Sequence, residues 1–290
     1  MLFQEAAELY MEEKSRKLRA NTLEGYASGM RCHVLPAWGL REVASISHAE
    51  LQAWVDGIPT AGAAEKAFKC FRQVYRWALR RLELRVWDVT QGIELPRAVP
   101  RRREQLSPAD IRAVLRAVDG EPYEAVVVAC ASLGLRPSEA AGLDWADVDW
   151  RSGWVHVRRG AHGVGCETVE YPCKTELSDR WLKLPRFALA RLRQLRGARR
   201  SGRMRGALSP RSIYGRLKRV LRRIGLGRAS VQLLRHAWAT VAIAAGAALE
   251  DVAVALGHSD TDMCRRHYLL STRAVVSRAQ GFFTRAVLGG

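Results

Sequence analysis

Residues 96–106 constrain the fold most, because this segment separates two parts of the chain whose apolar residues follow different patterns. It reads PRAVPRRREQL, with two prolines and four arginines. Proline fixes the backbone and removes a hydrogen-bond donor, and such composition is typical of interdomain segments. A chain of 290 residues is long enough for two domains. We therefore predict a helical domain over residues 1–95, a basic interdomain linker over 96–106 and a second domain over 107–290.

The first part of the chain has the spacing of amphipathic helices. Phe71 and Tyr75 belong to an apolar stripe on a long basic helix expected over about residues 61–84. Ser47, followed three residues later by Glu50, has the pattern of a capping box at a helix start. These signals predict a small domain built from helices separated by short turns.

The second part changes from helical to strand-like patterning and back. Three short segments are predicted as strands: 154–158, 168–171 and 181–184. The glycine-rich GAHGVG at 160–165 is predicted as a turn. Helices are expected over about 108–118 and 122–133, and again from residue 187 to the end. The fold class is therefore mainly α with a small antiparallel sheet (α+β), here of three strands.

The charge of the chain favours a polyanionic partner. Lysine and arginine number 47 against 29 aspartate and glutamate, giving a net charge of +18. No acidic residue occurs between Asp179 and Glu250, whereas residues 186–228 carry fifteen lysines or arginines. Single-sign segments of this kind usually meet phosphate. No apolar run has the length of a membrane span and no signal-peptide core is visible, so we expect a cytoplasmic DNA- or RNA-binding protein without a membrane partner.

Metal binding is not expected from the sequence. The six cysteines form no CxxC pair, which fits reduced thiols. His162, Cys166 and Cys173 match no common zinc spacing and lack a fourth ligand. The acidic turn at 144–149, which contains Asp144, Asp147 and Asp149, could suggest a metal nuclease, but a polar turn before the first strand is the favoured interpretation.

Two arginines and a late tyrosine describe a site that could hold a phosphodiester. Arg136 lies in GLRPSEAAGL and Arg235 in LLRH, and guanidinium groups suit phosphate oxygens. Pro137 fits the first turn of a helix, so Arg136 is expected at a helix start where Glu139 could brace its guanidinium. Tyr268 ends the segment LGHSDTDMCRRHY, and tyrosine can attack phosphorus and store the bond as a phosphotyrosyl ester. Such chemistry would need no metal or nucleotide cofactor.

Proton transfer in such a reaction requires further groups. Lys174, in a predicted hairpin, could protonate the leaving oxygen as a general acid. Lys183 is the alternative, but it falls in mid-strand and is expected to point to solvent. His258 could accept the tyrosine proton or brace the phosphate, since histidine titrates near neutrality.

Four motifs in this order resemble the tyrosine recombinase (phage integrase) family. They are GLRPSEAAGLDW, CKTELSDRWLKLP, LLRHAWAT and LGHS followed by the tyrosine, and NTLEGYASGMRCHVLPAWGL at 21–40 resembles that family's helical core-binding domain. The resemblance implies that Arg136 and Arg235 bind the scissile phosphate and that Lys174 acts on the leaving hydroxyl. It also implies that His258 completes the pocket and that Tyr268 is the nucleophile.

The resemblance carries expectations about assembly and substrate. It implies a SAM-like core-binding domain and a catalytic domain that form a C-shaped clamp on double-stranded DNA. It further implies a homotetramer on synapsed sites of a mobile element, a 3′-phosphotyrosyl intermediate rejoined without ATP, and allows for an accessory directionality factor. Many phage integrases carry an additional N-terminal arm-binding domain that is not visible in this sequence, so either this is a simple recombinase or the chain lacks part of its parent. Two alternatives remain: a type IB topoisomerase-like relaxing enzyme and a catalytically weakened DNA-binding relative.

The weakened alternative rests on Gln232. Three residues before the second arginine the family usually has histidine and sometimes lysine, whereas this chain has glutamine, which can donate a hydrogen bond to phosphate but cannot shuttle a proton. In the family the nucleophilic tyrosine is also commonly found at the position that His267 occupies here, nine residues after the LGH motif. A histidine adduct would be a labile phosphoramidate, so Tyr268 is preferred. Tyr214 is interpreted as a packing or DNA-contact residue. The apolar residues of 269–288 fit a tail helix that either closes its own domain or reaches a neighbouring protomer.

Overall fold

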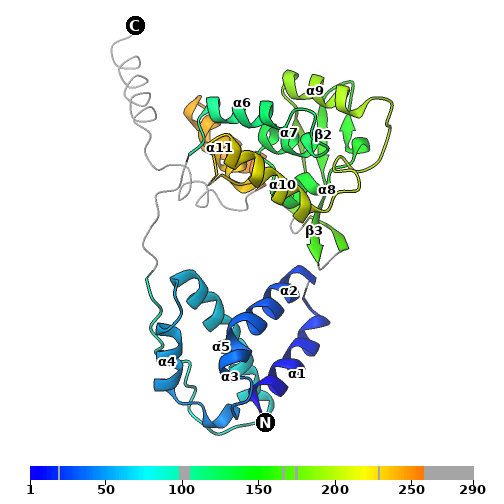
Figure 1. Ribbon diagram of the computed structural model, residues 1–290. Coiled ribbons are helices and arrows are strands. Elements are labelled where there is room, and N and C mark those ends of the chain that lie inside the picture. The colour runs from blue at the N-terminus through cyan, green and yellow to red at the C-terminus, as the bar shows by residue number, and fades with distance from the viewer. Residues whose placement is uncertain (19, 98–104, 165–166, 174–175, 228, 258–290) are drawn as a thin grey trace, which may run out of the picture. The chain divides into compact units, whose positions relative to one another are not determined.

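The computed structural model describes residues 1–18, 20–97, 105–164, 167–173, 176–227 and 229–257. The chain divides into two compact units, Met1–Arg102 and Arg103–Gly290, and each has a hydrophobic core of its own. Helices dominate both units, and the strands of the described residues all lie in the second (Figure 1). The predicted fold class, mainly α with small antiparallel pairing, is confirmed.

The first unit packs around the long helix α5 (Ala61–Arg81), close to the helix predicted over 61–84. The other helices are α1 (Phe3–Ser15), α2 (Ala20–Gly29), α3 (Leu35–Trp38) and α4 (His48–Asp56), with a π-helical turn at Met30–Val34. The Phe71 ring stacks on those of Phe3 and Tyr75, with centroids 4.9 and 5.5 Å apart. The predicted apolar stripe of α5 is thus the core of this unit.

The predicted capping box of Ser47 and Glu50 is confirmed at the start of α4. The Ser47 side chain accepts from the backbone N–H of Glu50, and the Glu50 carboxylate accepts from the backbone N–H of Ser47 at 3.1 Å. Each group satisfies an amide that the first helical turn leaves without a partner.

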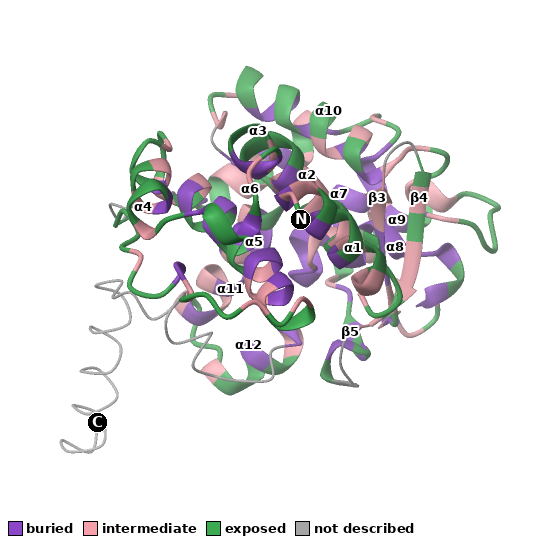
Figure 2. Cartoon of the chain, turned by 90° about the horizontal axis from the view of Figure 1, so that it is seen from below, coloured by how far each residue is buried: buried purple, intermediate pink, exposed green. Residues whose placement is uncertain are grey.

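Helix α7 (Glu124–Leu133) lies at the centre of the second unit. All of its residues are buried, as the purple ribbon in Figure 2 shows, because it is apolar around its whole circumference. The helices that contact it are α6 (Pro108–Ala117), α8 (Pro137–Gly142), α9 (Arg186–Arg196) and α11 (Val231–Ala244). Two more helices, α10 (Pro210–Arg223) and α12 (Leu249–Leu256), are described in this unit.

The strands form two separate sheets, so the predicted single three-stranded sheet is wrong in its membership. Strand β2 (Trp154–Val157) lies between β1 (Val148–Asp149) and β5 (Arg180–Lys183), antiparallel to both. Strand β3 (Arg159–Val164) pairs with β4 (Glu167–Pro172) in a second antiparallel sheet. The strands predicted at 154–158 and 181–184 are therefore neighbours, whereas the one at 168–171 belongs to the other sheet.

The predicted turn at 160–165 is also wrong, because residues 160–164 belong to β3. Gly160 pairs with Tyr171, and a Cβ on Gly160 would lie only 3.0 Å from the Tyr171 ring. The same ring stacks on His162, with centroids 5.1 Å apart. Glycine in this strand permits close packing of an aromatic ring and does not mark a change of direction.

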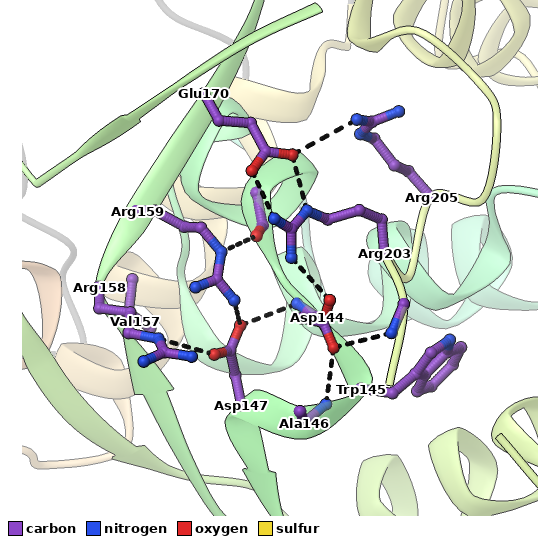
Figure 3. A network of polar contacts seen from close by, with 12 residues as sticks. Asp144, Trp145, Ala146, Asp147, Val157, Arg158, Arg159, Glu170, Arg203 and Arg205 are labelled. Atoms are coloured by element: carbon purple, nitrogen blue, oxygen red, sulfur yellow. Dashed lines mark hydrogen bonds and ion pairs between the residues drawn. The ribbon is translucent and has the colours of Figure 1, made fainter. Parts of the chain in front are cut away.

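The acidic turn before β1 is a polar turn, as predicted, and arginine side chains hold it in place (Figure 3). The side chain of Asp147 is 1% exposed, and its two oxygens accept from Arg158 at 3.0 Å and Arg159 at 2.6 Å. Arg159 also donates to the carbonyl of Gly142 at 3.0 Å. These contacts join the end of α8 to the junction between β2 and β3.

Arg203 extends this network to the second sheet. Its guanidinium binds Asp144 at 2.6 Å and Glu170 of β4 at 2.5 Å (Figure 3). The hydrogen bond from Arg203 is the main reason that the pKa of Glu170 is lowered. A single side chain thus ties the turn after α8 to the β3–β4 sheet.

Arg203→Met is expected to lower the free energy of unfolding by about 1 to 3 kcal/mol, because Asp144 loses its ion pair and Glu170 loses the closer of its two arginine partners. Urea denaturation at pH 7 measures the change. Arg200→Met is the matched control, since Arg200 is exposed and its loss should change stability by less than about 0.5 kcal/mol. Equal effects of the two substitutions would contradict a structural role for Arg203.

Candidate active site

Arg136 lies where a tight turn joins α7 to α8. Gly134 adopts the left-handed conformation with φ of 64°, and a Cβ there would lie 2.8 Å from the Trp238 ring, so only glycine fits. Arg136 then caps α8: its backbone N–H donates to Glu139 at 2.9 Å and its Nη1 donates to the same carboxylate at 2.6 Å. The predicted helix start and the predicted brace by Glu139 are both confirmed.

Arg235 lies on α11 and is buried, with 2% of its side chain exposed. Its Nη1 donates to the carbonyl of Gly134 at 2.9 Å, and lies 3.7 Å from the carboxylate of Glu139. The side chain of Arg136 is 34% exposed. The structure thus brings the two predicted arginines to one carboxylate, with Arg136 at the surface and Arg235 beneath.

A third arginine, which no sequence motif singles out, completes the cluster. Arg180 at the start of β5 is buried and binds both oxygens of Glu139, at 3.2 and 3.0 Å. In sequence it follows Asp179 in a polar segment and looks like a surface residue. The signal that could have found it is strand alternation, which places Arg180 on the same face as the buried Leu182.

The three guanidinium groups also bind three consecutive carbonyl groups at the end of α12. Arg180 donates to the carbonyl of Ala255 at 2.7 Å, Arg235 to that of Leu256 at 2.7 Å and Arg136 to that of Gly257 at 3.0 Å. A helix C-terminus carries partial negative charge and carbonyls without helical partners, so cations stabilise it. The arginine cluster therefore holds the turn that leads into residue 258.

Gly257 allows this turn to form. It has φ of 65° at the C-terminus of α12. A Cβ at this position would lie 2.9 Å from the carbonyl oxygen of Leu177 and 3.0 Å from Nη1 of Arg180. The glycine of the Leu-Gly-His motif is thus required both by its backbone conformation and by the space that Arg180 occupies.

Glu139 is the electrostatic centre of the site. Burial by itself raises the pKa of this carboxyl, but the hydrogen bonds and charge of Arg180 and the charge of Arg136 outweigh burial, so the pKa lies below its ordinary value. Glu139 is therefore ionised at neutral pH. One carboxylate faces three guanidinium groups, which leaves an excess of positive charge suited to an anion.

Two further sequence candidates have described positions. Gln232 is exposed in the first turn of α11, one helical turn before Arg235. Lys183 is exposed on β5, on the opposite face from Arg180, with its ammonium 5.4 Å from the centroid of the Trp154 ring. The expectation that Lys183 points to solvent is confirmed, and the lysine faces away from the Glu139 cluster.

Tyr214 of α10 is a packing residue. Its hydroxyl donates to the carbonyl of Pro137 at 2.7 Å, and burial raises its pKa. The group is therefore committed to the backbone beside Arg136. The remaining predicted site residues, Lys174, His258 and Tyr268, lie outside the described residues, as does His267.

The described residues contain no group of three histidine, cysteine or acidic side chains that could hold a metal ion. Of the zinc candidates, Cys173 contacts the carbonyl oxygens of Val157 and Ser178 through its sulfur, at 3.6 and 3.1 Å. Cys166 lies outside the described part of the chain. None of the helices that the structure describes combines the length and apolar character of a membrane span.

Comparison with family models gives two matches. Residues 104–274 match the phage integrase family, and residues 2–58 match the N-terminal SAM-like domain of phage integrases. The first match alone covers more than half of the chain. The chain belongs to the phage integrase (tyrosine recombinase) family.

Known proteins support this assignment. Tyrosine recombinase XerC of Xylella fastidiosa (strain 9a5c) is 26% identical to this recombinase over an alignment of 266 residues, with 84% of this chain and 84% of that protein covered. The Tn1549 transposon integrase, solved with transposon right end DNA, has a TM-score of 0.78 at 15% identity, covering 98% of this chain and 100% of that one. Lambda integrase, solved as a tetramer bound to a Holliday junction, has a TM-score of 0.69 at 16% identity, covering 92% of this chain and 77% of that one.

Glu139→Gln should lower the free energy of unfolding of this recombinase by about 3 to 5 kcal/mol at pH 7, because it leaves buried guanidinium charge uncompensated. The lowered pKa of Glu139 gives the effect a pH dependence. Its contribution is fully present above pH 4.5, the ordinary value for a glutamate, and is lost as the pH falls through the lower folded-state pKa.

Urea denaturation from pH 7 down to pH 3 measures the difference in the free energy of unfolding between the unsubstituted protein and Glu139→Gln. This gap should narrow below pH 4.5. The matched control is Glu167→Gln, since Glu167 is exposed on β4. A gap that stays constant with pH would contradict an ionised Glu139 at the centre of the site.

Proposed function

We propose that this tyrosine recombinase is a site-specific DNA recombinase that cleaves and rejoins strands through Tyr268. The observation that carries the proposal is the arginine cluster: three guanidinium groups share one buried carboxylate, and Arg136 is partly exposed. Preorganised cations of this kind stabilise the charge that develops on phosphate oxygens during phosphoryl transfer. In this proposal Arg136 binds the scissile phosphate from the surface and Arg235 supports it from beneath.

The reaction follows from the residue types. The Tyr268 hydroxyl attacks phosphorus, its oxygen–phosphorus bond forms, and the bond to the 5′ oxygen breaks. The tyrosine proton passes to a base, for which His258 is proposed, and the leaving 5′ oxygen takes a proton from Lys174. The product is a 3′-phosphotyrosyl ester with a free 5′ hydroxyl. Attack by the 5′ hydroxyl of a partner strand reverses these steps without ATP, a nucleotide cofactor or a metal.

The surface of α10 supports DNA as the substrate. The exposed cations of this helix are Arg211, Arg216, Lys218, Arg219, Arg222 and Arg223, and Figure 2 shows the helix green along much of its length. The basic segment is not uniform, however. Arg191, Arg203 and Arg205 instead form ion pairs within the second unit. Helix α10 therefore carries exposed positive charge that is available to a phosphate backbone.

The partners of the reaction are proposed by analogy. Solved structures of the Tn1549 and lambda integrases contain DNA, and one structure of lambda integrase is a tetramer bound to a Holliday junction. We propose that this chain likewise acts as a homotetramer on two synapsed double-stranded sites of a mobile element, with an accessory factor setting direction. Residues 1–95 would be its core-binding domain and residues 107–290 its catalytic domain, clamped on DNA. The protein would act in the cytoplasm.

A double-stranded substrate with a nick close to the cleavage site tests this function. The freed fragment diffuses away, so a denaturation-resistant protein–DNA adduct accumulates. Tyr268→Phe should abolish the adduct, because phenylalanine has no oxygen to attack phosphorus, while DNA binding in a gel shift remains unchanged. Denaturing gels of both proteins measure the adduct. Binding without any adduct would favour a DNA-binding relative, and relaxation of a plasmid without recombinant products would favour a topoisomerase-like enzyme.

Gln232 favours a second candidate function, that of a DNA-binding relative with weakened catalysis, because glutamine cannot transfer a proton. Gln232→His should therefore raise the rate of adduct formation by about 10-fold or more at pH 7. Single-turnover trapping with the nicked substrate measures the rate, and Gln232→Ala is the control that should give no gain. An unchanged rate in the histidine variant would remove Gln232 as the cause of any weak activity.

A further inference from the structure

We propose that Arg180 is a positioning residue of this recombinase, which holds Arg136 at the edge of the site through Glu139 and the end of α12. The inference rests on the proposed function, because it concerns the arginine assigned to the scissile phosphate. Arg180 is 8% exposed, and it connects β5 to α8 and α12. Its contacts explain why it acts through other residues.

All three nitrogens of the Arg180 guanidinium donate to protein acceptors. Nε donates to the carbonyl of Ala255 at 2.7 Å, and Nη1 donates to the carbonyl of Ser178 at 3.0 Å. Nη1 and Nη2 bind the two oxygens of Glu139 at 3.2 and 3.0 Å. The group is thus buried and engaged on each nitrogen, unlike the partly exposed Arg136.

Glu139 transmits the position of Arg180 to Arg136. The same oxygen, Oε1, accepts from Nη1 of Arg136 at 2.6 Å and from Nη1 of Arg180 at 3.2 Å. Because Arg180 binds both oxygens, it fixes the rotation of the carboxylate as well as its place. The orientation of the carboxylate in turn sets the plane of the Arg136 guanidinium.

The end of α12 provides a second path from Arg180 to Arg136. Arg180 holds the carbonyl of Ala255, and Nη2 of Arg136 donates to Gly257 two residues later. Loss of Arg180 would therefore remove one of the contacts that hold each of the two acceptors of Arg136. A lysine at position 180 keeps the positive charge but has one nitrogen, so it cannot span Glu139, Ser178 and Ala255 together.

The test compares adduct formation by Arg180→Lys on two nicked substrates. One has an ordinary phosphodiester at the cleavage site and the other a neutral methylphosphonate, which has no negative charge for Arg136 to balance. Arg180→Lys should slow adduct formation on the phosphodiester by about 100-fold, the scale of a misplaced catalytic group. On the methylphosphonate the same substitution should slow adduct formation by less than about one tenth of that factor. Because both rates come from one preparation, a lower folded fraction affects them equally.

A double-mutant cycle identifies the residue through which Arg180 acts. If it acts through Arg136, the variant carrying both Arg136→Lys and Arg180→Lys should be no more than about 3-fold slower than Arg136→Lys alone. Arg151→Lys is the matched control, since Arg151 is exposed in the turn between β1 and β2, and it should leave both rates unchanged. Arg180→Gln, which retains donors without the charge, serves as the second variant.

The outcomes are distinct. Equal losses on the two substrates, additive losses in the cycle, or an unchanged rate in Arg180→Lys would overturn the positioning role. Loss of all adducts in both the lysine and the glutamine variants would overturn it too, because a purely structural role then accounts for Arg180. If the unsubstituted protein forms no adduct on the phosphodiester, the proposed recombinase function itself fails.

Discussion

The ion pairs of Glu139 are the interactions on which the candidate site depends. This buried carboxylate binds Arg136 and Arg180 directly and lies 3.7 Å from Arg235. Three guanidinium groups, two of them buried, could not lie side by side without a counterion, because their repulsion and desolvation would be uncompensated. A single carboxylate reduces this cost while leaving positive charge for an incoming phosphate. Stability and anion affinity are therefore balanced at one residue.

The same arginines give shape to the backbone around them. Each binds one of the last three carbonyl groups before residue 258, from three elements far apart in the sequence. The glycine turns at Gly134 and Gly257 make this possible, since neither tolerates a side chain. The three arginines and the turn at the end of α12 thus form one hydrogen-bonded assembly, so a displacement of one is expected to displace the other.

The sequence was sufficient for the local parts of this site and insufficient for the parts made by tertiary contact. Arg136 could be placed because Pro137 and Glu139 are its neighbours in sequence, and helix-start signals are local. Arg180 was missed because its partners lie 41 and 75 residues away, and nothing near it distinguishes a buried arginine from a surface one. Strand pairing was mispredicted for a related reason: Gly160 packs under Tyr171, and a glycine-rich segment has the same composition whether it turns or extends. The roles of Lys174, His258 and Tyr268 stay predictions from the motifs.

The central claim is that the arginine cluster organised by Glu139 binds the phosphate that Tyr268 attacks. A crystal structure of the covalent adduct trapped on nicked DNA tests it most directly. The account predicts a phosphorus–oxygen bond to Tyr268, a non-bridging oxygen within hydrogen-bond distance of the Arg136 guanidinium, and Glu139 still bound to Arg136 and Arg180. A phosphate bonded elsewhere, or held by side chains remote from Arg136, would contradict it.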